Sequence, residues 1–549
     1  MNRKFIKLIE GDEMGLRRLL IILLLFSAIA ITGQPDGLYA QEYKVTCTRH
    51  WVTTWDGYKL DVDVYSPSNG ANFPLVIFSP SCGIGKIEYM IPATIIAKKG
   101  YVAVSYSARG RFKSTGIVNV GEENDMRDVS SIIDFVLANY PADKNNIGMS
   151  GISMGGVRSL TIPIHEKRIK AVAALSCTAN YHENLYKQNT PNNAHAFTGD
   201  PTIFADAVNN LINGGDISDT IRWMELLSPA TYLDDYNSLT RPPSIYISNA
   251  YDDSLMDNNT LLEFFKNLDF PEKVIDLNDG KHAFPVGIGC VGLPERTWTK
   301  VYKWFDFYLK GIPSDIVERV QKTKVGFQIK GTDERLYFDS WPPKQIWHQD
   351  LYLHPRQDCP TNFNNMKSGM NVFSYKSNAL DIIYSGTGSA ANLGPYGDLS
   401  EINLSPVTTN IDKLNGRYAL VYETIPFCWE SIIAGIPTLS LSVTPSMPDA
   451  QIIAYLYDVD NQGKGTLLTH SAWTLRDVIP GKRVRLDFDF KVLAARIPTN
   501  HRLALVLDTY DKIFGFPERP AYTVSIHYDD RPLLKMPYTY LKPIQEPMQ

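Results

Sequence analysis

The sequence has few cysteines for its length and none of the spacings that bind metals or phosphates. Its 549 residues include six cysteines, and no two of them form a Cys-x-x-Cys pair. No His-Glu-x-x-His string is present, and no glycine-rich loop ends in Lys-Ser or Lys-Thr. The chain therefore gives no support to metal or nucleotide chemistry, and we expect neither a metal site nor a cofactor.

An excess of one charge is also missing. The chain has 54 Lys and Arg against 59 Asp and Glu, a net charge of −5, and its basic residues are spread along its length. Nucleic acid is therefore not an expected partner. The 37 glycines and 34 prolines follow no period, which excludes collagen-like and repeat-array folds. The length corresponds to roughly two to four ordinary globular domains.

Only one extended apolar run is present, and it lies near the start. Arg17 and Arg18 precede the run from Leu19 to Ile31, and the small residue Ala40 follows it. This order predicts a secretory signal peptide over residues 1–40. The run is shorter than the about 20 residues that cross a bilayer. We expect a secreted or periplasmic protein without a stable membrane span; the alternative is a protein anchored in the membrane by an uncleaved signal.

Strand-like and helix-like patterns alternate through the first part of the expected mature chain. Continuous apolar runs at Leu75–Phe78 and Tyr101–Tyr106 predict buried strands, and apolar residues at helical spacing predict a helix over Met126–Leu137. Such alternation predicts parallel βαβ units, an α/β sheet with helices on both faces. We assign residues 41–323 to this domain.

Two further regions differ from this pattern. Residues 178–240 are polar and partly helical, which predicts a cap inserted over the carboxyl edge of the sheet. After about Lys324, short alternating segments lie between turns of Pro, Gly, Asn and Asp. They predict that residues 324–549 form an all-β sandwich or jelly roll.

A Gly-x-Ser-x-Gly string provides the first candidate for chemistry. Gly151-Ile152-Ser153-Met154-Gly155 lies between a predicted strand and a predicted helix, as a nucleophile elbow requires. The turn is tight, so side chains at the glycine positions would collide with the flanking elements. We therefore predict that Ser153 is a nucleophile.

Serine needs a base, and the base needs a carboxylate to orient it. In hydrolases with this elbow the order along the chain is serine, acid, histidine. After the predicted acid strand, His282 is the one histidine of the α/β part, and it follows the last strand of that part. Asp252 and Asp253 both follow the preceding strand. The distance from the strand end favours Asp252, with Asp253 as the alternative.

Backbone N–H groups are expected to stabilise the oxyanion. Met154, next to the nucleophile, should supply one of them. The other should come from Ser81 or Cys82, in the loop after the strand at Leu75–Phe78.

With these motifs the chain resembles the cocaine-esterase-like and X-prolyl dipeptidyl-peptidase hydrolases, from about Trp51 to Pro537. Besides the elbow and the two triad segments, the matching strings are Trp55-Asp56-Gly57, Arg109-Gly110-Arg111, Trp304-Phe305-Asp306, Leu309-Lys310-Gly311, Ser340-Trp341-Pro342-Pro343 and His501-Arg502-Leu503. The resemblance implies an α/β-hydrolase domain with a helical cap and a C-terminal jelly roll. It also implies a triad of Ser153, Asp252 and His282 that acts on esters or amides.

The chain departs from the family pattern at several places. Ser81 stands near the position of an oxyanion tyrosine in cocaine-esterase-like members, and Met154 stands where relatives often carry an aromatic residue. Ser107 replaces the usual aspartate before the Arg-Gly motif. The cap is short, and no acid is visible that could hold a peptide amino terminus.

These observations predict an exported serine hydrolase whose substrate is a small ester, an amide or a short peptide. It would cleave a carboxylic ester or amide through an acyl-enzyme and need no cofactor. The first alternative is an X-Pro dipeptidyl-peptidase. The second is a non-catalytic binding protein on a hydrolase scaffold.

Overall fold

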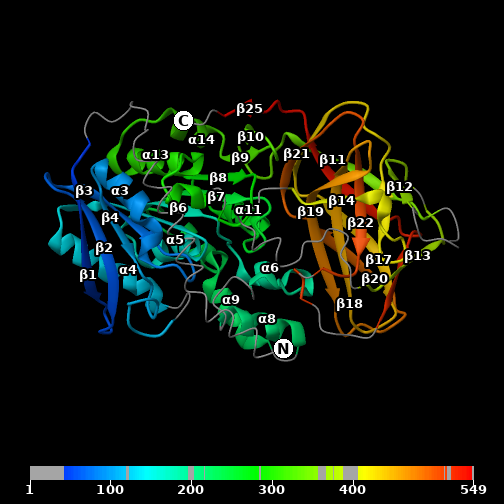
Figure 1. Ribbon diagram of the computed structural model, residues 1–549, viewed down its shortest axis with the longest axis horizontal. Coiled ribbons are helices and arrows are strands. Elements are labelled where there is room, and N and C mark those ends of the chain that lie inside the picture. The colour runs from blue at the N-terminus through cyan, green and yellow to red at the C-terminus, as the bar shows by residue number, and fades with distance from the viewer. Residues whose placement is uncertain are drawn as a thin grey trace.

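The computed structural model describes residues 42–118, 123–195, 203–214, 217–283, 286–356, 367–374, 376–386, 406–511, 513–515 and 521–546. The expected signal peptide over residues 1–40 lies outside these ranges. The described chain forms an α/β domain beside an all-β domain, with cap helices along one side (Figure 1). Among the described residues, no helix is long and apolar enough to cross a membrane.

A mixed sheet of eleven strands forms the centre of the α/β domain. Its order is β1-β2-β4-β3-β5-β6-β7-β8-β9-β10-β25. β1 and β2 form an antiparallel hairpin, and the strands from β4 to β9 in this order run parallel to one another. The strands are β1 (Val45–Thr53), β2 (Lys59–Pro67), β3 (Phe73–Ser79), β4 (Val102–Tyr106), β5 (Ala142–Ile152), β6 (Ile169–Leu175), β7 (Ser244–Ala250), β8 (Lys273–Asn278), β9 (Val325–Gln328), β10 (Glu334–Phe338) and β25 (Ile544–Gln545).

Helices cover both faces of this sheet, as the alternation predicts. Ile132 and Leu160 belong to the core on one face, and Ile96 and Phe305 to the core on the other. The helices are α3 (Met90–Lys98), α4 (Glu123–Asn139), α5 (Met154–His165), α11 (Asn258–Asn267), α12 (Val286–Cys290), α13 (Arg296–Lys310) and α14 (Asp315–Lys322), with the 3₁₀ turn η1 (Lys86–Tyr89). α13 ends at Gly311, whose left-handed φ of 68° a side chain would disfavour.

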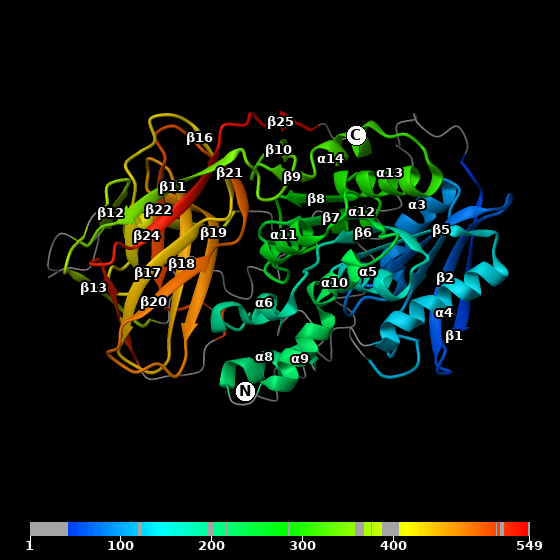
Figure 2. The same ribbon diagram turned by 180° about the vertical axis from the view of Figure 1, so that it is seen from behind.

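The insertion after β6 forms the expected helical cap. Its helices lie below the sheet and reach the all-β domain (Figure 2). Arg476 of the all-β domain donates to the carbonyls of Leu211 and Ile212 in the cap. The cap elements are α6 (Tyr181–Tyr186), η2 (Lys187–Asn189), α8 (Ile203–Asn213), α9 (Ser218–Leu227), η3 (Pro229–Tyr232) and α10 (Leu233–Asn237).

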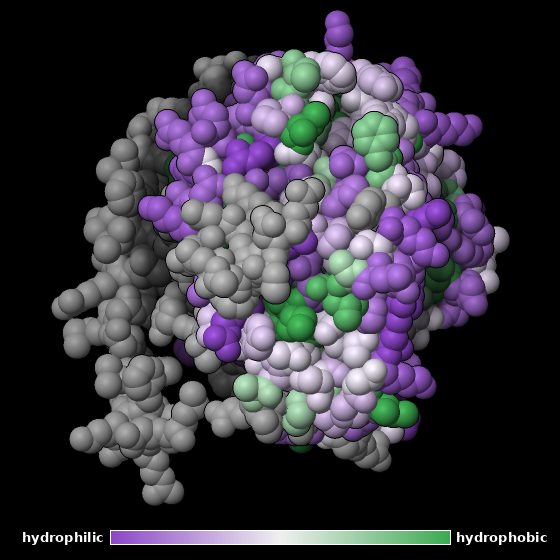
Figure 3. All heavy atoms as spheres, turned by 90° about the vertical axis from the view of Figure 1, so that its right-hand side faces the viewer, coloured by the Kyte–Doolittle hydropathy of each residue, from purple (hydrophilic) through white to green (hydrophobic). Residues whose placement is uncertain are grey.

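The all-β domain consists of two layers of strands, antiparallel except for the parallel pair of β12 and β15, packed over their own apolar core. Leu441, Ile452 and Leu505 are fully buried in this core, on three of the strands that sequence alternation predicts. At the end of the domain that faces away from the sheet, apolar residues lie in small groups between polar ones (Figure 3). The strands are β11 (Ile346–Leu353), β12 (Lys367–Asn371), β13 (Leu380–Tyr384), β14 (Thr408–Asn410), β15 (Leu420–Glu423), β16 (Ser431–Gly435), β17 (Thr438–Pro445), β18 (Ala450–Val459), β19 (Lys464–Leu475), β20 (Val484–Asp489), β21 (Leu493–Ile497), β22 (Arg502–Asp508), β23 (Thr523–His527) and β24 (Leu533–Thr539).

The boundary expected at residue 324 is wrong. β9 pairs parallel to β8, and β10 pairs antiparallel to β9, so both strands extend the first sheet. The chain then builds the all-β domain and returns, and β25 adds to the edge of β10. Short alternating strands look the same in the sequence whichever sheet they join, which is why the pattern misplaced this boundary.

The returning C-terminal segment is held by a buried ion cluster. The Glu546 carboxylate lies 2.7 Å from Arg335 Nε, 3.2 Å from Lys300 Nζ and 3.1 Å from Arg319 Nη2. Lys300 also lies 2.7 Å from Asp276. Burial alone would raise the pKa of Glu546, but Lys300 and Arg335 lower it to about 2.

Replacing Glu546 with Gln should lower the free energy of unfolding by about 3 kcal/mol, because it leaves the buried cations Lys300 and Arg335 with Asp276 as their one carboxylate among the described residues. The carboxylate's pKa falls from 4.5 to about 2 on folding, so its stabilisation is complete above about pH 4.5 and is lost as the pH falls toward 2. Urea unfolding at neutral and acidic pH measures both effects.

As a control, Glu263→Gln removes a surface pair with Lys266 while its amide oxygen can still accept from Asn267, so it should cost under about 1 kcal/mol. Equal unfolding midpoints for the Glu546 variant and the wild type would contradict this assignment.

Candidate active site

Ser153 occupies a strained turn between β5 and α5. Its backbone has φ 58° and ψ −122°, a conformation that residues with a side chain rarely adopt. The turn is possible because the residues two positions before and two positions after Ser153 are glycines. A Cβ on Gly155 would lie 2.1 Å from the Ser79 carbonyl oxygen, and one on Gly151 would lie 2.5 Å from the backbone of Gly155. The strand–serine–helix arrangement expected from the sequence is present.

His282 lies between Ser153 and an aspartate. Its Nε2 is 3.0 Å from Ser153 Oγ, and its Nδ1 is 2.8 Å from Asp253 Oδ2. The serine and the histidine are 9% and 8% exposed, and the aspartate is fully buried. The three residues follow β5, β8 and β7, so the parallel sheet brings their loops to one edge.

The aspartate beside His282 is Asp253, and the preference for Asp252 is wrong. The Asp252 side chain is 44% exposed, and its carboxylate accepts from Lys330 Nζ at 2.7 and 2.9 Å. Asp253 turns inward because its other oxygen accepts the N–H groups of Leu255 and Met256 at 2.9 and 2.8 Å. These local bonds set which of two adjacent aspartates points into the protein, and spacing from the strand does not reveal them.

The loop after β3 also differs from expectation. The Ser81 N–H donates to Glu88 Oε2 at 2.8 Å, so it is not available to an oxyanion. Met154 N–H begins α5, where it has no acceptor within its own helix. Cys82, the other expected donor, is partly buried against the core. The candidates that the geometry leaves are the Met154 and Cys82 amides.

Both domains match families of known proteins. Residues 56–225 match the model of the X-Pro dipeptidyl-peptidase (S15 family), and residues 319–530 match the X-Pro dipeptidyl-peptidase C-terminal non-catalytic domain. The chain belongs to this family of serine hydrolases. The resemblance drawn from its motifs is confirmed.

Solved structures share the whole fold with this hydrolase. An α-amino acid ester hydrolase has a TM-score of 0.71 at 13% identity, over 92% of this chain and 99% of that one. An aminopeptidase from a marine sediment Thaumarchaeota archaeon has a TM-score of 0.68 at 14% identity, over 92% and 98%. A CocE/NonD family hydrolase from Staphylococcus aureus has a TM-score of 0.63 at 13% identity, over 92% and 100%. Identities this low show the fold alone.

One curated relative matches a shorter stretch. The uncharacterized protein YcjY of Escherichia coli strain K12 is 29% identical over 104 residues. The match spans 19% of this chain and about a third (34%) of the length of YcjY.

The loop that carries Asp253 is held by the cap. Asn184 of α6 accepts the Asp257 N–H at 2.6 Å and donates to the Leu255 carbonyl at 2.6 Å. His195 Nε2 lies 2.6 Å from the same carbonyl. Burial lowers the pKa of His195 to about 3, so this ring is neutral at physiological pH. None of these cap residues belongs to a sequence motif, so sequence reasoning missed them.

The all-β domain holds the same loop from the other side. Lys491 Nζ donates to the Asp253 carbonyl at 2.9 Å. The side-chain amide of Asn259, at the start of α11, donates to the Phe490 carbonyl at 2.8 Å and accepts the Val492 N–H at 2.9 Å. The acid loop is therefore fixed by residues on either side of the domain boundary.

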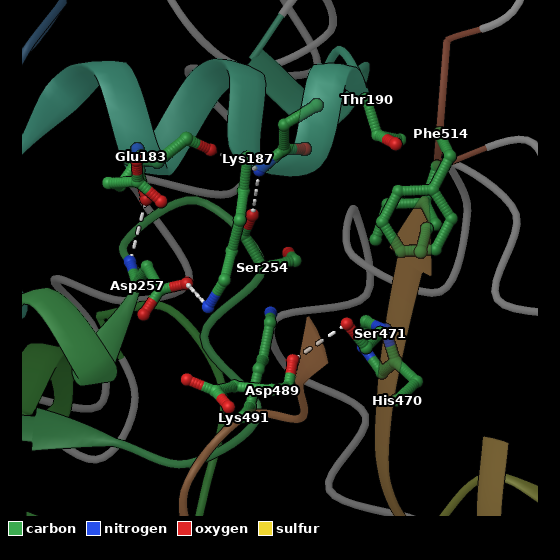
Figure 4. Close-up of a pocket in the computed structure, with 14 residues that line it drawn as sticks. Glu183, Lys187, Thr190, Ser254, Asp257, His470, Ser471, Asp489, Lys491 and Phe514 are labelled. Atoms are coloured by element: carbon green, nitrogen blue, oxygen red, sulfur yellow. Dashed lines mark hydrogen bonds and ion pairs between the residues drawn. The ribbon is translucent and has the colours of Figure 1, made fainter. Parts of the chain in front are cut away.

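A small cavity of about 60 Å³ lies where the cap, the acid loop and the all-β domain meet (Figure 4). Glu183, Asp257 and Asp489 line it together with Lys187 and Lys491. Lys187 and Asp257 point toward one another, 3.5 Å apart. These carboxylates come from three distant segments that only the fold brings together, so the sequence pattern did not reveal the group.

Exchanging each aspartate for asparagine should separate their roles. Asp253→Asn should lower kcat by about 10⁴-fold, because an amide can no longer hold His282 in the tautomer that accepts the serine proton. The matched variant Asp252→Asn loses only an exposed pair with Lys330 and should stay within about twofold of wild type. Steady-state kinetics on p-nitrophenyl acetate measure both variants. A large loss in the Asp252 variant with little loss in the Asp253 variant would reverse the assignment.

Proposed function

We propose that Ser153, His282 and Asp253 form a catalytic triad that hydrolyses a carboxylic ester or amide through an acyl-enzyme. The observation that carries the proposal is the unbroken line of contacts Asp253–His282–Ser153, at 2.8 and 3.0 Å. The strained backbone at Ser153 supports it, because elbows of this kind present a serine for attack.

The geometry fits the following steps. Ser153 Oγ attacks the substrate carbonyl carbon while its proton passes to His282 Nε2. Asp253 Oδ2 accepts the hydrogen bond from His282 Nδ1 and stabilises the imidazolium. The leaving group then takes the proton from Nε2. Water, deprotonated by the same nitrogen, attacks the acyl-enzyme, releasing the acid and restoring the serine.

The developing oxyanion needs donors that are already in place. We assign this role to the backbone N–H groups of Met154 and Cys82. Met154 adds the positive end of the α5 dipole, which favours negative charge beside the nucleophile.

A second candidate function is release of dipeptides from an X-Pro amino terminus. The cavity beside the acid loop supports it, since Glu183, Asp257 and Asp489 could together neutralise a substrate ammonium group. Two structural neighbours are an aminopeptidase and an α-amino acid ester hydrolase, names that refer to substrates with an amino group.

We also propose export through a signal peptide over residues 1–40, on the basic, apolar and small-residue pattern of that segment.

An alkyl fluorophosphonate should label the wild-type protein once and should not label Ser153→Ala, because the probe reports an activated serine. Cys82→Ala keeps its backbone amide and should be labelled like wild type, which excludes the thiol as the nucleophile. Intact-protein mass spectrometry gives the stoichiometry. No labelling at all would favour a binding protein on a hydrolase scaffold, and equal labelling of Ser153→Ala and wild type would show that the reactive group is not Ser153.

A substrate panel should then separate esterase from peptidase. An esterase turns over p-nitrophenyl acyl esters far faster than Ala-Pro-p-nitroanilide, and a dipeptidyl-peptidase does the reverse. If the cavity carboxylates bind the substrate ammonium, Glu183→Gln raises KM for the anilide by roughly tenfold and leaves KM for p-nitrophenyl acetate as it was. Unaltered anilide kinetics in this variant would remove the cavity from the peptidase proposal.

A further inference from the structure

Ser81 lies between a glutamate and the nucleophile elbow. Its Oγ is 2.5 Å from Glu88 Oε1 and 3.0 Å from the carbonyl oxygen of Ile152, the residue before Ser153. Its N–H donates to the other glutamate oxygen, Oε2, at 2.8 Å. Ser81 belongs to the loop after β3 and Glu88 to η1. The Ser81 side chain therefore links this loop to the elbow, and Glu88 holds the Ser81 side chain.

The number of hydrogens available to the contacts among Ser81, Glu88 and the Ile152 carbonyl depends on the protonation of Glu88. A serine hydroxyl has one hydrogen, and an ionised carboxylate and a carbonyl have none. With Glu88 ionised, Ser81 can donate to Glu88 or to Ile152, and the other contact holds no hydrogen. With a proton on Glu88 Oε1, every contact is satisfied: Glu88 donates to Ser81 Oγ, and Ser81 Oγ donates to the Ile152 carbonyl.

The surroundings of Glu88 favour the protonated form near neutral pH. Burial of its carboxyl raises its pKa to about 7, although Ser81, the Tyr89 hydroxyl and the Arg158 guanidinium oppose the rise. Arg158, from α5, donates to the Pro80 carbonyl at 3.0 Å. Cys290, from α12, also lies near Glu88, and burial keeps the pKa of its thiol high, so it adds no charge.

We propose that Glu88 is a positioning residue that, while it carries a proton, ties the loop after β3 to the nucleophile elbow through Ser81. The idea rests on the proposed function of Ser153. When the proton leaves to water, the charged carboxylate takes the Ser81 hydroxyl hydrogen, and the Ile152 carbonyl loses its donor. The Ile152 N–H remains bound to the Tyr89 hydroxyl at 2.8 Å and the Ser153 N–H to the Leu175 carbonyl at 2.9 Å, so the elbow loses its tie to the loop after β3 and keeps these two.

We therefore expect kcat to depend on whether Glu88 carries its proton. His282 must be neutral to act as a base, so kcat rises with pH through the histidine transition. Above the pKa of Glu88, near 7, kcat should fall by roughly three- to tenfold, the range expected for one lost hydrogen bond, with KM unaffected. In Glu88→Gln the amide nitrogen donates to Ser81 Oγ and the amide oxygen accepts the Ser81 N–H, which reproduces the protonated pattern at every pH.

The experiment compares wild type, Glu88→Gln, Glu88→Ala and Ser81→Ala in pH profiles of kcat for p-nitrophenyl acetate. Wild type should show the alkaline fall and Glu88→Gln should lack it, while Glu88→Ala and Ser81→Ala should have a lower kcat without this transition. The control is Glu295→Gln. Glu295 is another partly buried glutamate with a raised pKa, but it caps α13 and does not contact Ser81. Its variant should keep the wild-type profile.

A readout independent of turnover completes the test. The infrared difference spectrum of wild type minus Glu88→Gln should contain the carbonyl band of a protonated carboxylic acid, which disappears as the pH rises through about 7. Absence of this band, or a Glu88→Gln profile that keeps the alkaline fall or matches that of Glu88→Ala, would overturn the proposal. Fluorophosphonate labelling of Ser153 in the same samples identifies a failure of the triad itself, which the infrared band does not depend on.

Discussion

The close approach of helix α5 to the loop after β3 and to β6 is the contact around which the site is built. A Cβ on Gly155 would lie 2.1 Å from the Ser79 carbonyl, and a Cβ on Gly156 would lie 2.6 Å from the Leu175 carbonyl. Without side chains at these positions the helix can begin directly at the strand end, and Ser153 is left in a backbone conformation that it would not adopt alone. The contact between His282 Nε2 and Ser153 Oγ depends on this turn, because the turn points Oγ toward the histidine.

Burial of the acid is the second constraint. A fully buried carboxylate is unfavourable unless each oxygen has partners. Asp253 meets this condition with two backbone amides on one oxygen and His282 on the other. Those amides belong to a loop that Asn184 holds from the cap and Lys491 holds from the all-β domain. Orientation of the histidine therefore depends on three separate parts of the chain.

The sequence predicts the scaffold and two of the three positions of the proposed triad. Gly-Ser-Gly spacing between a strand and a helix identifies Ser153, and chain order identifies His282, since both depend on local pattern. The choice of Asp253 over Asp252 depends on which carboxylate captures the Leu255 and Met256 amides, and adjacent residues carry no pattern that distinguishes them. The loss of Ser81 as an oxyanion donor depends on Glu88, seven residues away, through a contact that no periodicity encodes. The extra strands β9, β10 and β25 were missed for a related reason, because pairing partners are a property of the whole fold.

The return of the chain to its first sheet affects when the site is complete. A ribosome makes Ser153 and His282 long before Lys491 and Glu546, and domains generally fold in the order of synthesis. The acid loop lacks its contact with Lys491 until the all-β domain has formed, and β25 joins the first sheet only after the all-β domain has been synthesised. A growing or truncated chain therefore contains the proposed nucleophile and base before the all-β domain adds its contact to the acid loop.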